Sequence, residues 1–154
     1  MSNKEIYLQV DRVVRGRLLE NQEELDSHVE YIQKIFDDFY TPLMKNLLKI
    51  FNINWNEKES EITCFLGCYP VFPRDVISKE FWVNFNSSDE KIIKGSIHEI
   101  DHFVLFEKWK SMHGYDKRLQ PQHPETLWFL EELSVDPTLN EKSIQEITPY
   151  QQLA

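Results

Sequence analysis

Residues 87–112 read SSDEKIIKGSIHEIDHFVLFEKWKSM, and this stretch decides the fold. Ser87 and Ser88 can cap a helix that runs from about Asp89 to about Met112. The acidic residues 89 and 90 suit the positive end of that helix's dipole. Apolar residues then recur at steps of four, three and four, namely Ile93, Ile97, Ile100 and Val104. The spacing predicts a long helix with one apolar stripe.

The same helix carries His98 and His102 on the side away from its apolar stripe, at about 100° per residue. Histidines at positions i and i+4 point the same way, so they can bind one Zn²⁺ ion. Glu99 lies between them, beside the water that such an ion would hold. Gly95 lies one turn earlier, where it either allows a close backbone approach or has no consequence. The alternative is a helix with two ordinary polar or half-buried histidines.

A second helix is expected after Pro124, and Pro137 is expected to end it. Its buried stripe is predicted to consist of Leu127, Leu130 and Leu133. Glu132 and Asp136 are four residues apart, so they share another face of the helix. A catalytic zinc ion needs a third protein ligand, which Glu132 could provide. Asp136 could then accept the free ring N–H of a zinc-bound histidine.

From about Phe81 to Asp136 the chain resembles the gluzincins, the thermolysin-like group of HExxH zinc metallopeptidases. In that family the third ligand is a glutamate on a later helix, and an aspartate four residues beyond it supports a histidine ligand. The resemblance implies a zinc-dependent peptidase acting on a peptide or protein substrate, with Zn²⁺ as cofactor. The implied roles are zinc ligands for His98, His102 and Glu132, general base for Glu99, and support of a histidine ligand for Asp136.

Two residues depart from the family pattern. Asp101 occupies a position that is usually uncharged, and it could reach solvent or a partner. Glu131 precedes Glu132 and could be the third ligand instead, although the spacing to Asp136 favours Glu132. The metzincin pattern, which needs a glycine and a third histidine soon after the motif, is absent between residues 103 and 107.

Other interpretations of the same residues remain open. Cys64 and Cys68 could join His98 and His102 in a structural Cys₂His₂ zinc site, although two buried, reduced thiols fit the spacing better. The chain is short for a complete thermolysin-like enzyme. A non-catalytic zincin-like domain that binds a metal or a protein partner is therefore the main alternative, and a domain without metal is a further one.

Composition sets the frame for these hypotheses. The 154 residues suit a single domain spanning 1–154, and 41% hydrophobic with 13% aromatic residues favour a folded globule. The formal charge of −9 disfavours binding to nucleic acid or to an anionic membrane. The chain shows no apolar run long enough for a membrane span and no signal-like N-terminus, so a cytoplasmic protein is expected.

The expected fold is α+β and zincin-like. A small mixed or antiparallel sheet is expected to pack on the helix that carries the HExxH sequence at residues 98–102 and on the later helix that carries Glu132, with further helices at the N-terminus. Strands are predicted at residues 61–66 and 81–85, and a loop or edge between them, because Gly67, Pro70 and Pro73 interrupt that region. The strand at 81–85 is the candidate edge for binding an extended peptide.

Three further expectations concern the rest of the chain. Alternating apolar residues at 6, 8 and 10 predict a short strand. Helical spacing from Leu25 to Leu43 predicts a helix, with Thr41 and Pro42 starting a new one that reaches Phe51. His113, Tyr115, His123 and Tyr150 are candidates for stabilising a developing oxyanion.

Overall fold

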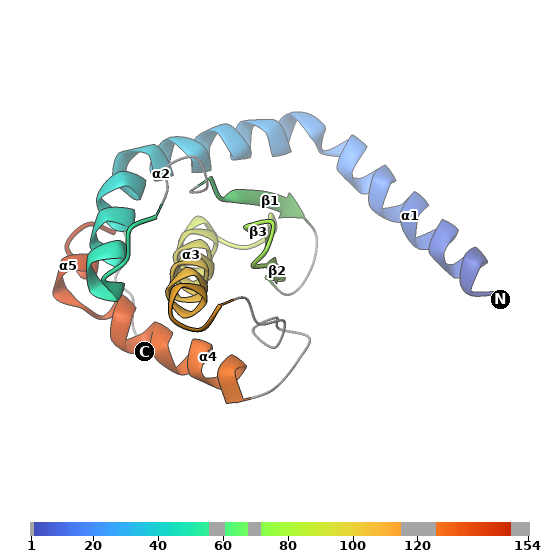
Figure 1. Cartoon of the computed structure of the whole chain (residues 1–154). Coiled ribbons are helices and arrows are strands. Elements are labelled where there is room, and N and C mark those ends of the chain that lie inside the picture. Colours follow the sequence, from blue (N-terminus) through green and yellow to red (C-terminus); the bar gives the residue numbers. More distant parts are fainter. Residues whose placement is uncertain (1, 56–60, 68–71, 115–125, 149–154) are drawn as a thin grey trace.

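The computed structural model describes residues 2–55, 61–67, 72–114 and 126–148 (Figure 1). Within these residues the chain forms five helices and one three-stranded sheet, so the expected α+β class is confirmed. In chain order the elements are α1 (Asn3–Glu20), α2 (Gln22–Phe51), β1 (Thr63–Gly67), β2 (Arg74–Asp75), β3 (Glu80–Asn84), α3 (Asp89–His113), α4 (Thr126–Leu139) and α5 (Lys142–Gln145).

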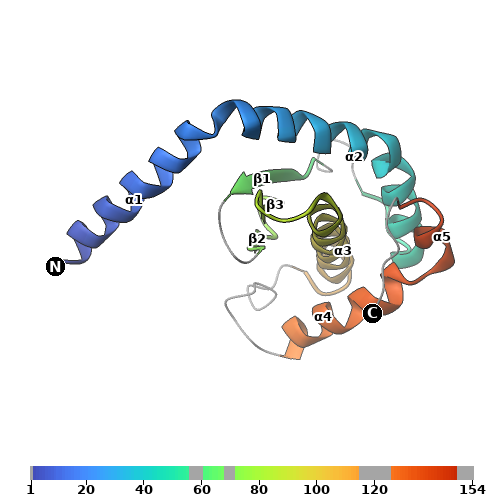
Figure 2. The same cartoon turned by 180° about the vertical axis from the view of Figure 1, so that it is seen from behind.

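Helix α3 lies in the middle of the body, with α2, the sheet and α4 around it (Figures 1 and 2). It begins where the sequence predicts, because the Ser88 hydroxyl accepts a hydrogen bond of 3.3 Å from the backbone N–H of Lys91. The four residues of the predicted apolar stripe are all buried. From residue 96 to residue 104 only His98 is not fully buried, so α3 is enclosed on nearly every side.

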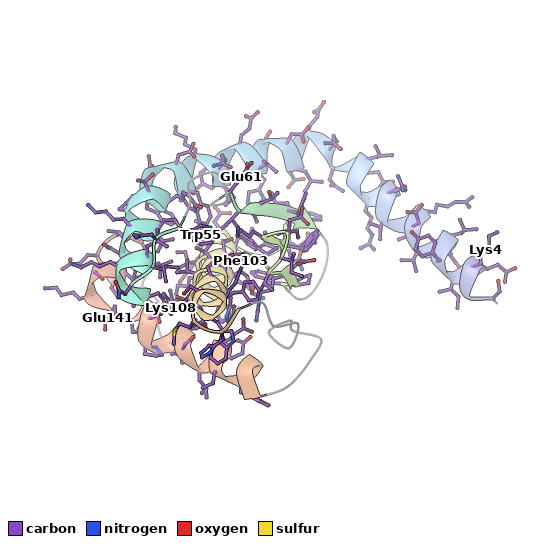
Figure 3. The ribbon with its side chains drawn as sticks, in the orientation of Figure 1. Lys4, Trp55, Glu61, Phe103, Lys108 and Glu141 are labelled. Carbon is purple, nitrogen blue, oxygen red and sulfur yellow. The ribbon has the colours of Figure 1, made fainter. Side chains whose placement is uncertain are left out.

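The hydrophobic core forms between α3 and its neighbours. Figure 3 shows Phe103 among side chains in the middle of the body. Its ring lies 6.2 Å from that of Phe81 on β3. Leu43 and Leu47 on α2 and Val83 on β3 belong to the same buried cluster. Burial of such side chains contributes roughly 1.5–3 kcal/mol each.

The sheet has the strand order β1-β3-β2. Strands β1 and β3 are parallel, with Thr63 opposite Glu80, and β2 is antiparallel to β3, with Arg74 opposite Phe81. Strand β3 is therefore central, and the prediction that residues 81–85 offer an exposed edge is wrong. Both sides of that strand are used by neighbouring strands, whereas β2 lies at the edge of the described sheet.

The predicted helix break at Pro42 is also wrong, because α2 continues through that residue. Proline removes one backbone hydrogen bond from a helix interior. Here Phe39, three residues before the proline, and Leu43, directly after it, are both buried and hold the two halves of α2 on the core. The helix arches over the body instead of ending (Figure 1). Tertiary packing thus overrides the local signal.

The strand predicted near the N-terminus is replaced by helix α1, which extends away from the body (Figure 2). Ile6, Val10 and Val13 also fit helical spacing, and the described residues offer this segment no strand to pair with. All three of these side chains are exposed. Figure 3 labels Lys4 near the far end of this helix.

Helix α4 presents a different face from the predicted one. Leu130 and Leu133 are 49% and 71% exposed, whereas Glu131 and Val135 are buried. The leucine stripe was therefore predicted on the wrong face, and Leu127 has no described side chain. The helix also continues two residues past Pro137 to Leu139. No helix in the described ranges is both long and apolar enough to cross a bilayer.

The central position of α3 makes a prediction about stability. Ile97 has no exposed surface, so Ile97→Ala should lower the free energy of unfolding by about 2–5 kcal/mol through lost burial and a cavity. Ile77 is 53% exposed, and Ile77→Ala should change it by less than about 0.5 kcal/mol. Urea unfolding of the two metal-free variants measures the difference, and similar losses would contradict the central placement of α3.

Candidate metal centre

Two histidines on α3 provide the first part of the site. The Nε2 atoms of His98 and His102 lie 2.9 Å apart, because the residues are one helical turn apart and both side chains project from the same face of α3. His102 is completely buried, and His98 is partly exposed. Burial lowers the pKa of His102 to about 2, with the charges of Arg74 and His98 adding to the effect. The ring is therefore neutral, as a metal ligand has to be.

Glu132 on α4 completes a group of three. Its Oε2 atom lies 3.4 Å from Nε2 of His98, and its Oε1 atom lies 3.5 Å from Nε2 of His102. The interaction with His98 contributes most to lowering the pKa of Glu132 to about 2. One donor atom from each of the three residues lies within 4.8 Å of the others. The sequence predicted this grouping, and the structure brings the three side chains together.

These distances suit a zinc ion. Zinc binds nitrogen and oxygen ligands at about 2.0–2.2 Å, and a tetrahedron of that size places its donor atoms about 3.4 Å apart. The distances of 3.4 and 3.5 Å from the two Glu132 oxygens to the histidines match that value. The distance of 2.9 Å between the two histidine nitrogens is shorter. The donor set, two imidazoles and one carboxylate, is the set used by many catalytic zinc sites. Cys64 is not in the group and Cys68 lies outside the described residues, so the Cys₂His₂ alternative gains no support. Cys64 is exposed, so the prediction of a buried thiol is wrong at that position.

Glu99 lies beside this group on the same helix. Its carboxylate is buried, and Oε2 accepts a hydrogen bond of 3.2 Å from Nη1 of Arg74. Burial raises the pKa of Glu99 above its ordinary value, while the charges of Arg74 and His98 oppose the rise. A carboxyl group with a raised pKa next to a metal position is suited to accepting and returning a proton.

The sequence did not identify Arg74 as part of the site. This β2 residue has a side chain only 6% exposed, and its guanidinium contacts carboxylates on two helices. Nη2 lies 3.5 Å from Oε2 of Glu131 and 3.4 Å from Oε1 of Glu132. One weak signal could have pointed to it, namely the charged pair Arg74 and Asp75 between the apolar residues of the segment from Phe72 to Ile77.

Glu131 pairs with Arg74 and is absent from the three-residue donor group. Its side chain is buried, and burial raises its pKa to about 7 although Arg74 opposes the rise. The pairing with Arg74 explains why the face of α4 that carries Glu131 is directed toward the interior. The alternative that Glu131 takes the place of Glu132 among the donor atoms therefore finds less support in the geometry.

Asp136 lines the same groove as His98, but it is exposed. In the described part of the chain its carboxylate forms no hydrogen bond with either histidine, and Nδ1 of His102 is buried without a partner. Support of a histidine ligand by Asp136 therefore stays a prediction. Of the residues predicted to stabilise an oxyanion, His113 is the last residue of α3. Tyr115, His123 and Tyr150 lie outside the described residues.

A groove of about 690 Å³ opens onto His98 and Glu132 of the candidate metal centre. Its lining includes Phe72, Arg74, His98, Glu99, Glu132 and Leu139. The Phe72 ring lies directly against Gly95, and a Cβ atom at that position would overlap ring carbons Cδ2 and Cε2. The glycine therefore allows the close approach that the sequence raised as one possibility. A second cleft, of about 580 Å³, lies between α2 and the sheet and includes none of the donor residues.

Comparisons with protein-family models, with curated proteins and with solved structures found no match for this chain. Function therefore has to be inferred from the geometry of the site.

One buried group in α3 yields a prediction about pH. Asp101 has no exposed surface, and both of its carboxylate oxygens lack hydrogen-bond partners in the described structure. Burial raises its pKa well above the ordinary value, so the folded chain retains a proton that the unfolded chain loses near pH 4. Stability then falls as the pH rises from about 4 through the folded-state pKa.

Asp101→Asn removes this ionisation without changing the side-chain size. The metal-free variant should exceed the parent in free energy of unfolding by about 1–3 kcal/mol at pH 8. The two proteins should be nearly equal at pH 3, where Asp101 is protonated in both states. Urea unfolding at the two pH values measures the effect, and a difference that does not depend on pH would contradict it.

Proposed function

We propose that this protein is a small zincin of the gluzincin type that hydrolyses peptide bonds. The observation that supports it most is the convergence of His98, His102 and Glu132 from two helices, with Glu99 beside them. Those three residues would hold Zn²⁺. When bound, Zn²⁺ supplies Lewis acidity, which polarises a carbonyl and brings the pKa of water toward neutrality.

Glu99 is the proton carrier of the proposed reaction. Its carboxylate takes a proton from the attacking water and returns it to the leaving amine. Its raised pKa makes this carboxylate a better proton acceptor than an ordinary glutamate, and the hydrogen bond from Arg74 keeps it facing the site. His102 remains neutral because it is buried, so it does not compete for the proton.

The edge of the sheet supports a peptide as the substrate. Pro73 accepts a hydrogen bond of 3.0 Å from the N–H of Trp82 on β3. The backbone N–H and C=O groups of successive residues in an antiparallel strand alternate between its two sides. Those of Arg74, the residue after Pro73, therefore face away from β3. An extended peptide could bind there by strand addition. This edge replaces the one predicted at residues 81–85.

A second candidate function is a metal-binding domain without catalysis. The ion pair between Arg74 and Glu99 favours it, because the positive charge of Arg74 lowers the pKa of Glu99 and so makes this carboxylate a weaker proton acceptor. Turnover decides between the two functions, since both require the metal.

The ligand set can be tested through zinc binding. The purified chain should bind about one zinc ion, measured by mass spectrometry. Loss of a group that only hydrogen-bonds to a metal ligand weakens metal binding roughly 10- to 100-fold. Glu132→Ala removes a proposed ligand itself, so it should weaken zinc binding by more than this. Glu131→Ala is the matched control and should weaken it less, because Glu131 contacts Arg74 instead of the histidines. The opposite order would make Glu131 the ligand, and no bound zinc would contradict the proposal.

The catalytic role can be tested with Glu99→Gln. This variant should keep its zinc and lose turnover on a fluorogenic peptide library by about 100- to 10,000-fold, because glutamine cannot accept the proton. Unchanged turnover in the variant would remove Glu99 from the mechanism. Zinc binding without turnover in the parent chain would support the non-catalytic alternative.

A further inference from the structure

Arg74 occupies an unusual position for a charged residue. Its side chain is almost completely buried, and it contacts Glu99 on α3 and both Glu131 and Glu132 on α4. In the described ranges it is the one cationic side chain, apart from histidine, that pairs with any of these carboxylates. One guanidinium from β2 thus links the two helices that form the candidate metal centre.

The charges explain why such a link is needed. Three carboxylates lie around one guanidinium in a part of the molecule that excludes much of the water. Like charges in that setting repel each other more strongly than in solution. Without a cation, Glu99 and Glu131 would move apart or take up protons. Arg74 allows Glu99, Glu131 and Glu132 to remain close to one another.

The backbone around Arg74 is fixed from two directions. On one side β2 pairs with β3, where Arg74 lies opposite the buried Phe81. On the other side the Phe72 ring packs against Gly95 of α3, which has no side chain to prevent it. These two contacts bring β2 close to α3 and direct the guanidinium toward the carboxylates.

We propose that Arg74 is a positioning residue that holds Glu99 and Glu132 in their places beside His98 and His102. This inference rests on the proposed zinc-peptidase function. Nη1 holds the general base, and Nη2 holds the third ligand together with Glu131. Glu131 acts through Arg74, because it supplies a second carboxylate that keeps the guanidinium in place.

The geometry requires arginine and not simply a positive charge. Two different nitrogens of a planar group contact carboxylates on two helices. The single ammonium of lysine lies at the end of a flexible chain and cannot reproduce this fork. Arg74→Lys therefore keeps the charge of the site and loses its geometry.

The test compares Arg74→Ala and Arg74→Lys with the parent chain and with Arg15→Ala, an exposed arginine on α1 that pairs with Asp11. Zinc affinity is measured by competition with a chelator, and kcat and KM on the peptide substrate are measured at saturating zinc. Both Arg74 variants should lose at least about tenfold in zinc affinity, as for other groups that orient metal ligands. They should also lose kcat with little change in KM, and Arg15→Ala should match the parent.

Chemical rescue separates positioning from general support of the fold. Guanidinium chloride at low millimolar concentration should restore part of the zinc affinity and kcat of Arg74→Ala, whereas sodium chloride at equal ionic strength should not. If Arg74→Ala does not fold, the charge-balanced variant Arg74→Gln with Glu131→Gln replaces it, because it removes one positive and one negative charge. A folded variant with parental zinc affinity and kcat would overturn the inference.

Failure of the proposed function has a different signature. It shows in the parent chain, which would bind no zinc or cleave no peptide, and the inference would then be overturned with it. Failure of the inference alone shows in the Arg74 variants, which would bind zinc and cleave peptide as the parent does.

Discussion

The enclosure of α3 constrains the rest of this structure. A helix buried on nearly every side cannot leave its polar residues in contact with water. Glu99, Asp101 and His102 are buried in its middle turns, and burying such groups without partners is costly. Arg74 and Glu132 approach two of these residues from β2 and α4. The cluster of Arg74, Glu132 and the polar residues of α3 is thus the way in which the fold accommodates part of the polar face of its central helix.

Asp101 is a buried polar residue of α3 that receives no such partner. It lies between Glu99 and His102 in the helix, yet neither of its oxygens has a partner in the described structure. The resemblance to gluzincins already marked this residue as a departure. The structure does not bear out the expectation that it could reach solvent, because the side chain has no exposed surface. Asp101 is a buried acid that the fold keeps without an evident structural use.

The sequence was most informative where the signals were local. The cap, length and apolar stripe of α3 follow from residues within a few turns of each other, and all three predictions are confirmed. The two histidines and Glu132 were also identified together, because helical periodicity and a known ligand pattern both point to them. Pro42 gave a strong local signal that was misleading, since packing on both sides of it keeps α2 continuous.

The sequence failed where a residue acts at a distance. No local pattern shows that Arg74 meets Glu131, which is 57 positions away, or Glu132, which is 58 positions away. Without that knowledge, Leu130 and Leu133 were the natural choice for the buried face of α4. Instead, Glu131 is buried against Arg74, and this directs its side of α4 toward the core. One ion pair between distant residues thus explains why Arg74 was missed and why the buried face of α4 was predicted wrongly.

These separations have a consequence for the order of folding. The two histidines form a pair as soon as one helical turn exists, whereas Arg74 and Glu132 join them only after distant parts of the chain have met. Closing long loops is an entropic cost that has to be met before such contacts form. During synthesis, the two histidines would therefore be paired well before Glu132 and Arg74 reach them. Under the proposed function, the affinity for zinc that needs all three donor residues would arise last, with the docking of α4 and β2.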